Sequence, residues 1–153
     1  MDLADCLARG ATCMALEPRK RDESLRVLLD GLVQAQAMPA GLVDRAFEAI
    51  LERERLGSTA IGNGVAVPHA RVDELDQIVV AFGRSEAGIE FKALDCEPVH
   101  ELFLVLAPSG AAEEYLSVMQ QITRLVQNQD FRRFVGGLKG DQDVLDLIRE
   151  MAS

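Results

Sequence analysis

Two histidines, His69 and His100, are the side chains in this chain best suited to nucleophilic chemistry. A histidine is largely uncharged near neutral pH, so its imidazole can attack an electrophile and form a covalent intermediate. His69 directly follows Val67 and Pro68, at the end of an apolar segment. The residue types alone leave two alternatives open for His69: a nucleophile, or a histidine that only caps a strand.

The segment that leads to His69 has a pattern that would hold this side chain firmly. Residues 62–64 read Gly-Asn-Gly, and such residues accept the positive φ angles of a hairpin turn. Pro68 lacks the backbone N–H that a ladder needs, so we expect the second strand to end there. The pattern predicts a strand, a tight turn and another strand, with His69 at the strand exit and within reach of the surface.

The remaining elements follow from hydrophobic periodicity. Strands are predicted at residues 11–16, 58–61, 65–67, 77–82 and 101–107. Helices are predicted at residues 2–8, 22–37, 41–55, 115–126, 130–136 and 141–151. The strand at 102–107 is apolar on both faces, which is typical of a central, covered strand. We therefore expect an α/β fold in which a mixed β-sheet of about five strands is flanked by helices, forming a single domain over residues 1–153.

Composition excludes several classes of function. The net charge of −9 argues against a nucleic-acid binder, because phosphate backbones repel an acidic surface. The longest apolar runs are far shorter than a membrane span, and the start of the chain does not read as a signal peptide, so a cytoplasmic location is expected. Cys6, Cys13 and Cys96 have no metal-type spacing and are expected to be buried thiols. Without coiled-coil heptads, a monomer or weak dimer is expected.

The segment 53–69 gives the chain a family resemblance. This segment ends in Ala66-Val67-Pro68-His69 and resembles the active-site segment of enzyme IIA of the bacterial phosphotransferase system, fructose/mannitol type, which includes nitrogen-regulatory members. Residues 88–91, 98–99 and 102–108 extend the resemblance, which covers nearly the whole chain. It implies the fold of that family and phosphorylation of His69 by the histidine carrier HPr or a paralogue. No cofactor is expected, and no metal either, because the cysteines and histidines lack the spacing of a metal site.

The resemblance also implies which side chains assist. Arg53 aligns with an arginine of the family segment, and it lies on the flank of its helix, about 90° from the centre of the apolar face. The alternative is a solvated surface arginine, like Arg55. Ser58 and Thr59 could donate hydrogen bonds to the phosphoryl group or to the imidazole, or they could serve only the turn.

A second histidine is present at the active site of many members, in the first turns of the helix after the central strand. That position here is Tyr115, which could donate a hydrogen bond to a phosphoryl oxygen or pack in the core.

His100 is expected to be a hydrogen-bonded core histidine, on the same face as Leu102. Glu54, near the centre of its helix face, is expected to be a partly buried partner of a basic group.

Two functions remain open from the resemblance. One is a free-standing regulatory module of the nitrogen-regulatory type, whose phosphorylation state controls binding to kinases or transporters. The other is a sugar-uptake enzyme IIA that passes the phosphoryl group to an enzyme IIB partner. Tyr115 and the absence of a IIB-like segment favour regulation.

Overall fold

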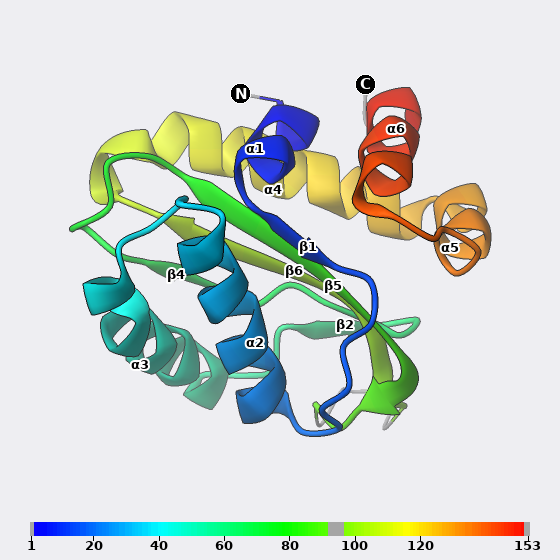
Figure 1. Ribbon diagram of the computed structural model, residues 1–153, viewed down its shortest axis with the longest axis horizontal. Coiled ribbons are helices and arrows are strands. Elements are labelled where there is room, and N and C mark those ends of the chain that lie inside the picture. The colour runs from blue at the N-terminus through cyan, green and yellow to red at the C-terminus, as the bar shows by residue number, and fades with distance from the viewer. Residues whose placement is uncertain (1, 92–96, 152–153) are drawn as a thin grey trace.

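A mixed β-sheet with helices on both faces forms the fold in the computed structural model, which describes residues 2–91 and 97–151, with the backbone alone at residues 61 and 62 (Figure 1). The helices are α1 (Leu3–Arg9), α2 (Arg21–Gln34), α3 (Val43–Arg55), α4 (Ala112–Gln127), α5 (Gln129–Val135) and α6 (Asp141–Met151), with short 3₁₀ turns η1 (Ala40–Leu42) and η2 (Ser109–Ala111). The strands are β1 (Ala11–Cys13), β2 (Ala60–Gly62), β3 (Val65–Ala66), β4 (His69–Arg71), β5 (Val79–Ile89) and β6 (Val99–Ala107).

The sheet is organised around β6. Within the described residues the strand order is β1-β5-β6-β3-β2, and β4 pairs with a later part of β6 than β3 does. The β5–β6 pair is antiparallel, whereas β3 and β4 both run parallel to β6. The predicted mixed sheet flanked by helices is confirmed, and so is the central position of the strand that precedes Pro108.

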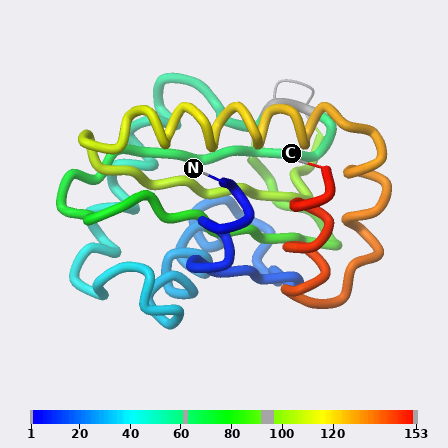
Figure 2. The backbone as a smooth tube through the Cα atoms, turned by 90° about the horizontal axis from the view of Figure 1, so that it is seen from above, coloured from blue at the N-terminus to red at the C-terminus, as the bar shows by residue number. Residues whose placement is uncertain are grey.

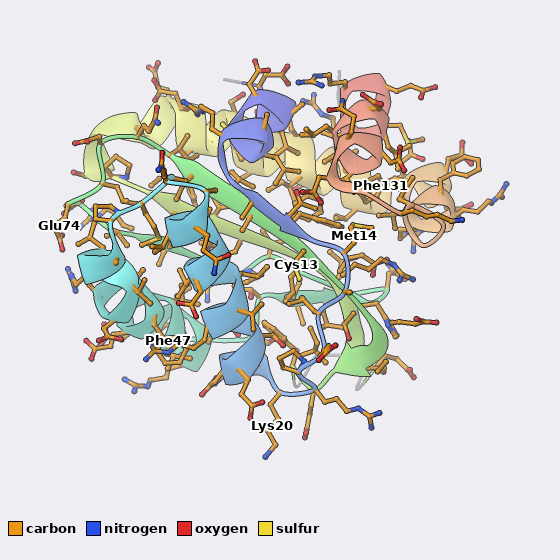
Figure 3. All side chains as sticks on the ribbon, viewed as in Figure 1. Cys13, Met14, Lys20, Phe47, Glu74 and Phe131 are labelled. Atoms are coloured by element: carbon orange, nitrogen blue, oxygen red, sulfur yellow. The ribbon has the colours of Figure 1, made fainter. Side chains whose placement is uncertain are left out.

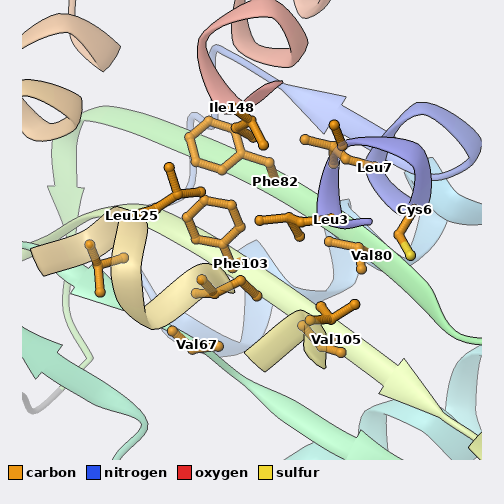
Figure 4. Packing of buried hydrophobic residues seen from close by; sticks show 14 of the residues in the cluster. Leu3, Cys6, Leu7, Val67, Val80, Phe82, Phe103, Val105, Leu125 and Ile148 are labelled. Atoms are coloured by element: carbon orange, nitrogen blue, oxygen red, sulfur yellow. The ribbon is translucent and has the colours of Figure 1, made fainter. Parts of the chain in front are cut away.

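Two hydrophobic cores lie on the two faces of the sheet. Along β6, Phe103 and Val105 point to one core while Leu102 and Leu104 point to the other, as the period of two requires. The first core is closed by α1, α4, α5 and α6, with the rings of Phe82 and Phe103 at 4.9 Å near its centre (Figure 4). Helices α2 and α3 close the second core. Figure 2 shows α1 and α6, at the two ends of the chain, beside each other on the first face.

Two predicted strand boundaries were wrong. The strand expected at 77–82 continues to Ile89, although Gly83, Arg84 and Ser85 break its apolar pattern. Gly83 leaves room for Leu16, because a Cβ there would lie 2.5 Å from the Leu16 side chain, and Arg84 pairs in register with Glu101. The strand expected at 11–16 ends at Cys13.

The cysteines differ from one another in exposure. Cys6 is buried, as expected, and burial raises the pKa of its thiol. Cys13 is only half-buried, contrary to the expectation, because β1 is the edge strand of the sheet. Both thiols are free, and Cys96 lies outside the described residues.

Candidate functional site

A pocket of about 890 Å³ lies between α3 and the N-terminal end of α4, across the ends of β4 and β6. In Figure 1 these elements meet at the left side of the molecule, and Figure 3 places Glu74 at this end and Phe131 at the other. The structure brings three of the predicted site residues, His69, Arg53 and Tyr115, to the walls of this one pocket. Their neighbours there include Ala70, Ala107, Pro108, Ser109 and Ala112.

The backbone around Pro68 positions His69. As expected, the strand does not run through Pro68, since β3 ends at Ala66. A second short strand, β4, which the sequence analysis did not predict, begins at His69. The ladder survives the proline because the backbone N–H of Val105 donates to the carbonyl of Pro68 at 2.9 Å, a bond that needs no proline N–H. His69 is then in register with Val105 of the buried central strand. The sequence pattern did not reveal this strand, since three residues are too few to show a period.

The imidazole of His69 is oriented by a backbone carbonyl in the break between β3 and β4. Its Nδ1 atom lies 2.8 Å from the carbonyl oxygen of Val67. A carbonyl oxygen can only accept, so this contact requires the proton on Nδ1 and leaves the lone pair of the neutral ring on Nε2. The hydrogen bond occupies Nδ1, and the side chain is only half-buried and lines the pocket. Nε2 is therefore the nitrogen available for chemistry.

Arg53 differs from the other arginines of the pocket. Arg45, Arg55 and Arg71 are each in an ion pair, with Glu74 at 3.2 Å, Glu52 at 3.9 Å and Asp73 at 3.5 Å. Arg53 instead donates to the backbone carbonyl of Gly57 at 3.1 Å, and no described carboxylate forms an ion pair with it. A guanidinium has five N–H donors, so most of those of Arg53 stay free for an anionic group.

Tyr115 reaches the pocket from the first turns of α4. The centres of its ring and of the His69 ring are 6.1 Å apart and the ring planes are inclined by 48°. The ring also packs against the first core, so the two alternatives for Tyr115, pocket wall and core aromatic, both hold. Burial raises the pKa of Tyr115 above its ordinary value, and the positive charge of Arg53 opposes this only in part.

Ser58 and Thr59 lie outside the residues that line the pocket. The Thr59 hydroxyl donates to the buried carboxylate of Glu54, and the Thr59 backbone N–H points at the same carboxylate at 3.3 Å. The Ser58 hydroxyl donates to the carbonyl of Phe91 at 3.3 Å. The Thr59 bonds tie the end of α3 to the start of β2, and the Ser58 bond ties the loop between them to Phe91, just after β5. The expectation that Glu54 pairs with a basic group was wrong, because its partner is Thr59.

His100 is remote from this pocket. It lies five residues before Val105 on β6, so the two histidines are separated by roughly 16 Å along the strand direction. Its Nδ1 contacts the carbonyl of Ser85 at 2.8 Å, which confirms the hydrogen bond that we expected, although the side chain is half-buried rather than fully in the core.

Within residues 2–91 and 97–151, no group of three or more His, Cys, Asp or Glu side chains is arranged to hold a metal ion. No helix in that part of the chain combines the length and the apolar character needed to cross a bilayer.

Comparison with known sequences identifies relatives over nearly the full length. Residues 11–151 match the family described as phosphoenolpyruvate-dependent sugar phosphotransferase system, EIIA 2. The chain is 34% identical to a nitrogen regulatory protein of Bradyrhizobium diazoefficiens, over 97% of this chain and 95% of the relative. It is also 34% identical to the fructose-specific EIIA component of the phosphotransferase system of Haloferax volcanii, over 88% and 86%.

Solved structures have the same fold. The nitrogen regulatory protein IIA-Ntr of Neisseria meningitidis superposes with a TM-score of 0.84 at 25% identity, over 95% of this chain and 98% of the other. The mannitol enzyme IIA of Escherichia coli, solved in complex with phosphorylated enzyme IIB, superposes with a TM-score of 0.75 at 19% identity, over 92% and 94%.

Proposed function

Since the chain belongs to the EIIA 2 family of the phosphoenolpyruvate-dependent sugar phosphotransferase system, we propose that it is a phosphocarrier that accepts a phosphoryl group on Nε2 of His69. The observation that carries the proposal is the contact of Nδ1 with the Val67 carbonyl, because it selects Nε2 as the nucleophile. The same half-buried ring forms part of the pocket wall, where a donor could present its phosphoryl group.

The transfer follows from these contacts. Nε2 attacks the phosphorus of a phosphohistidine on the donor, the old P–N bond breaks, and its electron pair returns to the donor ring. The Val67 carbonyl keeps the proton on Nδ1, so the phosphorylated ring of His69 carries positive charge and departs as a neutral imidazole in the onward step. Arg53 attracts the dianionic phosphoryl group into the pocket and holds its oxygens there. Ser58 and Thr59 support this arrangement indirectly, through the loop that joins α3 to β2.

We infer the partners from membership of the family. The donor is HPr or a paralogue of it, and the recipient is a regulated protein, such as a kinase or transporter, whose binding depends on the phosphorylation state of His69. The relative named as a nitrogen regulatory protein supports this assignment. The relative named as a fructose-specific component supports the alternative, in which an enzyme IIB receives the phosphoryl group. Transfer from the phosphorylated chain to a purified fructose-type IIB would favour the alternative.

Labelling with radioactive phosphoenolpyruvate tests the acceptor. The chain is incubated with enzyme I and HPr, and we expect one label that is labile in acid and stable in base, as a phosphohistidine is. His69→Ala should abolish the label, whereas His100→Ala, the matched control, should retain it. Equal labelling of wild type and His69→Ala would refute the proposal, and a base-labile label would point to an acyl phosphate instead.

A further inference from the structure

Tyr115 contributes a polar group to the pocket, on an aromatic ring that neighbours the ring of His69. The 6.1 Å between the ring centres of His69 and Tyr115 is within the range of neighbouring aromatic side chains. Helix α4 and the first core hold the Tyr115 ring in place from behind. Its hydroxyl has no hydrogen-bond partner among the described residues. The ring that carries this hydroxyl therefore lies beside the His69 ring and lines the same pocket, and no hydrogen bond to a described residue occupies the hydroxyl.

The charge state of this hydroxyl decides what it can do. Burial disfavours the phenolate and raises the pKa of Tyr115, so the group remains protonated at neutral pH. A protonated phenol donates a hydrogen bond without carrying a net charge. A phosphoryl group on His69 would bring strong acceptor oxygens into the pocket that Tyr115 and Arg53 share.

We propose that Tyr115 prolongs the lifetime of the phosphorylated state, because its hydroxyl donates a hydrogen bond to an oxygen of the phosphoryl group on His69. The inference rests on the phosphorylation of His69 proposed above. It assigns to Tyr115 the role of slowing the loss of the phosphoryl group from His69. Tyr115 acts on the phosphoryl oxygens, and it takes no part in breaking the P–N bond.

The negative charge on the phosphoryl oxygens decides whether the Tyr115 hydroxyl lengthens or shortens the lifetime of the phosphohistidine. Loss of the phosphoryl group to water passes through a loose, metaphosphate-like transition state. In that state the oxygens carry less negative charge than in the bound dianion. A donor to these oxygens therefore stabilises the phosphohistidine more than the transition state, and its removal shortens the lifetime.

The Tyr115 ring could also shield the P–N bond from water without any help from the hydroxyl. Two variants separate these effects. Tyr115→Phe removes the hydroxyl and keeps the ring, whereas Tyr115→Ala removes both. Leu116→Ala is the matched control, because Leu116 is the next residue of α4 and is 59% exposed.

The test uses phosphoramidate, a small-molecule donor that phosphorylates imidazole with release of ammonia. After its removal, ³¹P NMR follows the decay of the signal that is absent in His69→Ala. We expect the signal of Tyr115→Phe to decay about fivefold faster than wild type, which corresponds to about 1 kcal/mol, and that of Leu116→Ala to decay at the wild-type rate. Equal lifetimes for wild type and Tyr115→Phe would overturn the inference, even if Tyr115→Ala decays faster.

A second readout follows the hydroxyl itself. Tyr115 is the single tyrosine of the chain, so protein labelled with ¹³C at Cζ of tyrosine gives one resonance. We expect this resonance to shift when His69 is phosphorylated and to stay unchanged in His69→Ala treated in the same way. An unshifted resonance in phosphorylated wild type would also overturn the inference.

The two proposals fail in distinguishable ways. Wild-type protein that takes up phosphate from phosphoramidate but not from HPr would contradict the proposed function alone. Normal labelling by HPr with equal lifetimes would contradict the inference alone. A His69 that neither donor can phosphorylate would overturn both.

Discussion

At the scale of single residues, the chemistry depends on which side-chain groups already have a hydrogen-bond or ion-pair partner within the protein and which do not. Nδ1 of His69 is bound to a carbonyl, and three of the pocket arginines are paired with carboxylates. Among the described residues of the pocket, Nε2 of His69, the guanidinium of Arg53 and the hydroxyl of Tyr115 stay available. Sequence reasoning could name these residues, but it could not show that neighbouring Arg55 is paired and Arg53 is not.

Replacement of Arg53 tests the importance of that free charge. Arg53→Gln should lower kcat/KM for phosphorylation by HPr by about 10- to 100-fold, because the pocket loses its unpaired cation. Arg55→Gln is the matched control from the same helix turn, exposed and paired with Glu52, and should change the rate less than about twofold. The rates are measured by rapid-quench labelling. Similar losses in both variants would mean that general surface charge, and not Arg53, attracts the phosphoryl group.

At the scale of secondary structure, elements with clear periodicity could be predicted, and those defined by tertiary pairing could not. Helix α2 was predicted to within a few residues because Leu25, Leu28, Leu29 and Leu32 recur at helical spacing. Strand β4 was missed because its existence depends on β6, to which the chain returns in parallel after Pro68. The last part of β5 was missed because polar residues there face Glu101 and the turn rather than a core.

The turn between α1 and β1 depends on a close approach of two backbones. A Cβ on Gly10 would lie 1.8 Å from the carbonyl oxygen of Val80, which belongs to the rigid β5 strand. Gly10→Ala should therefore lower the free energy of unfolding by about 3 kcal/mol. Gly41→Ala is the control, since no atom outside its immediate neighbours lies within 4 Å of the new Cβ, and it should change stability by less than about 0.5 kcal/mol. Urea denaturation measures both, and equal stabilities would contradict the close approach.

At the scale of the whole molecule, the fold class followed from the order of the elements, but the location of the site did not. Helices, then strands, then helices predicted a covered mixed sheet. The pocket, however, brings together α3 and α4, which are separated in the sequence by β2 to β6. Only the family resemblance linked Arg53 to Tyr115 before the structure placed them in one pocket.

The stability of the molecule should respond to the ionisation of Glu101. Glu101 is 9% exposed, and burial raises its pKa in the folded protein, with Arg84 opposing in part. The folded state therefore holds this proton more tightly than the unfolded chain. The stabilisation is complete below the unfolded pKa and is lost as the pH rises through the folded one.

Glu101→Gln keeps a neutral side chain at every pH. Relative to wild type, its free energy of unfolding should therefore increase as the pH rises from the ordinary pKa of a glutamate, about 4.3, through the raised pKa of Glu101 in the folded protein. Glu86→Gln, at an exposed position of the same sheet, should show no such trend. The measurement is urea denaturation at several pH values. A difference between Glu101→Gln and wild type that does not depend on pH would contradict the prediction.

The parallel pairing of the short strand β4 with β6 also bears on the order in which the chain folds. His69 and its register partner Val105 are joined by a parallel pairing, and the whole of β5 lies between them in the sequence. Pairings between distant positions form slowly, because a long loop must close before they can contribute. His69 has its Val105 neighbour, and with it the support of β6, only once this long-range pairing is in place. If His69 is the acceptor, as proposed above, a newly made chain would become able to take up a phosphoryl group only at a late stage of folding, and phosphorylation would then mark the molecules that have completed the sheet.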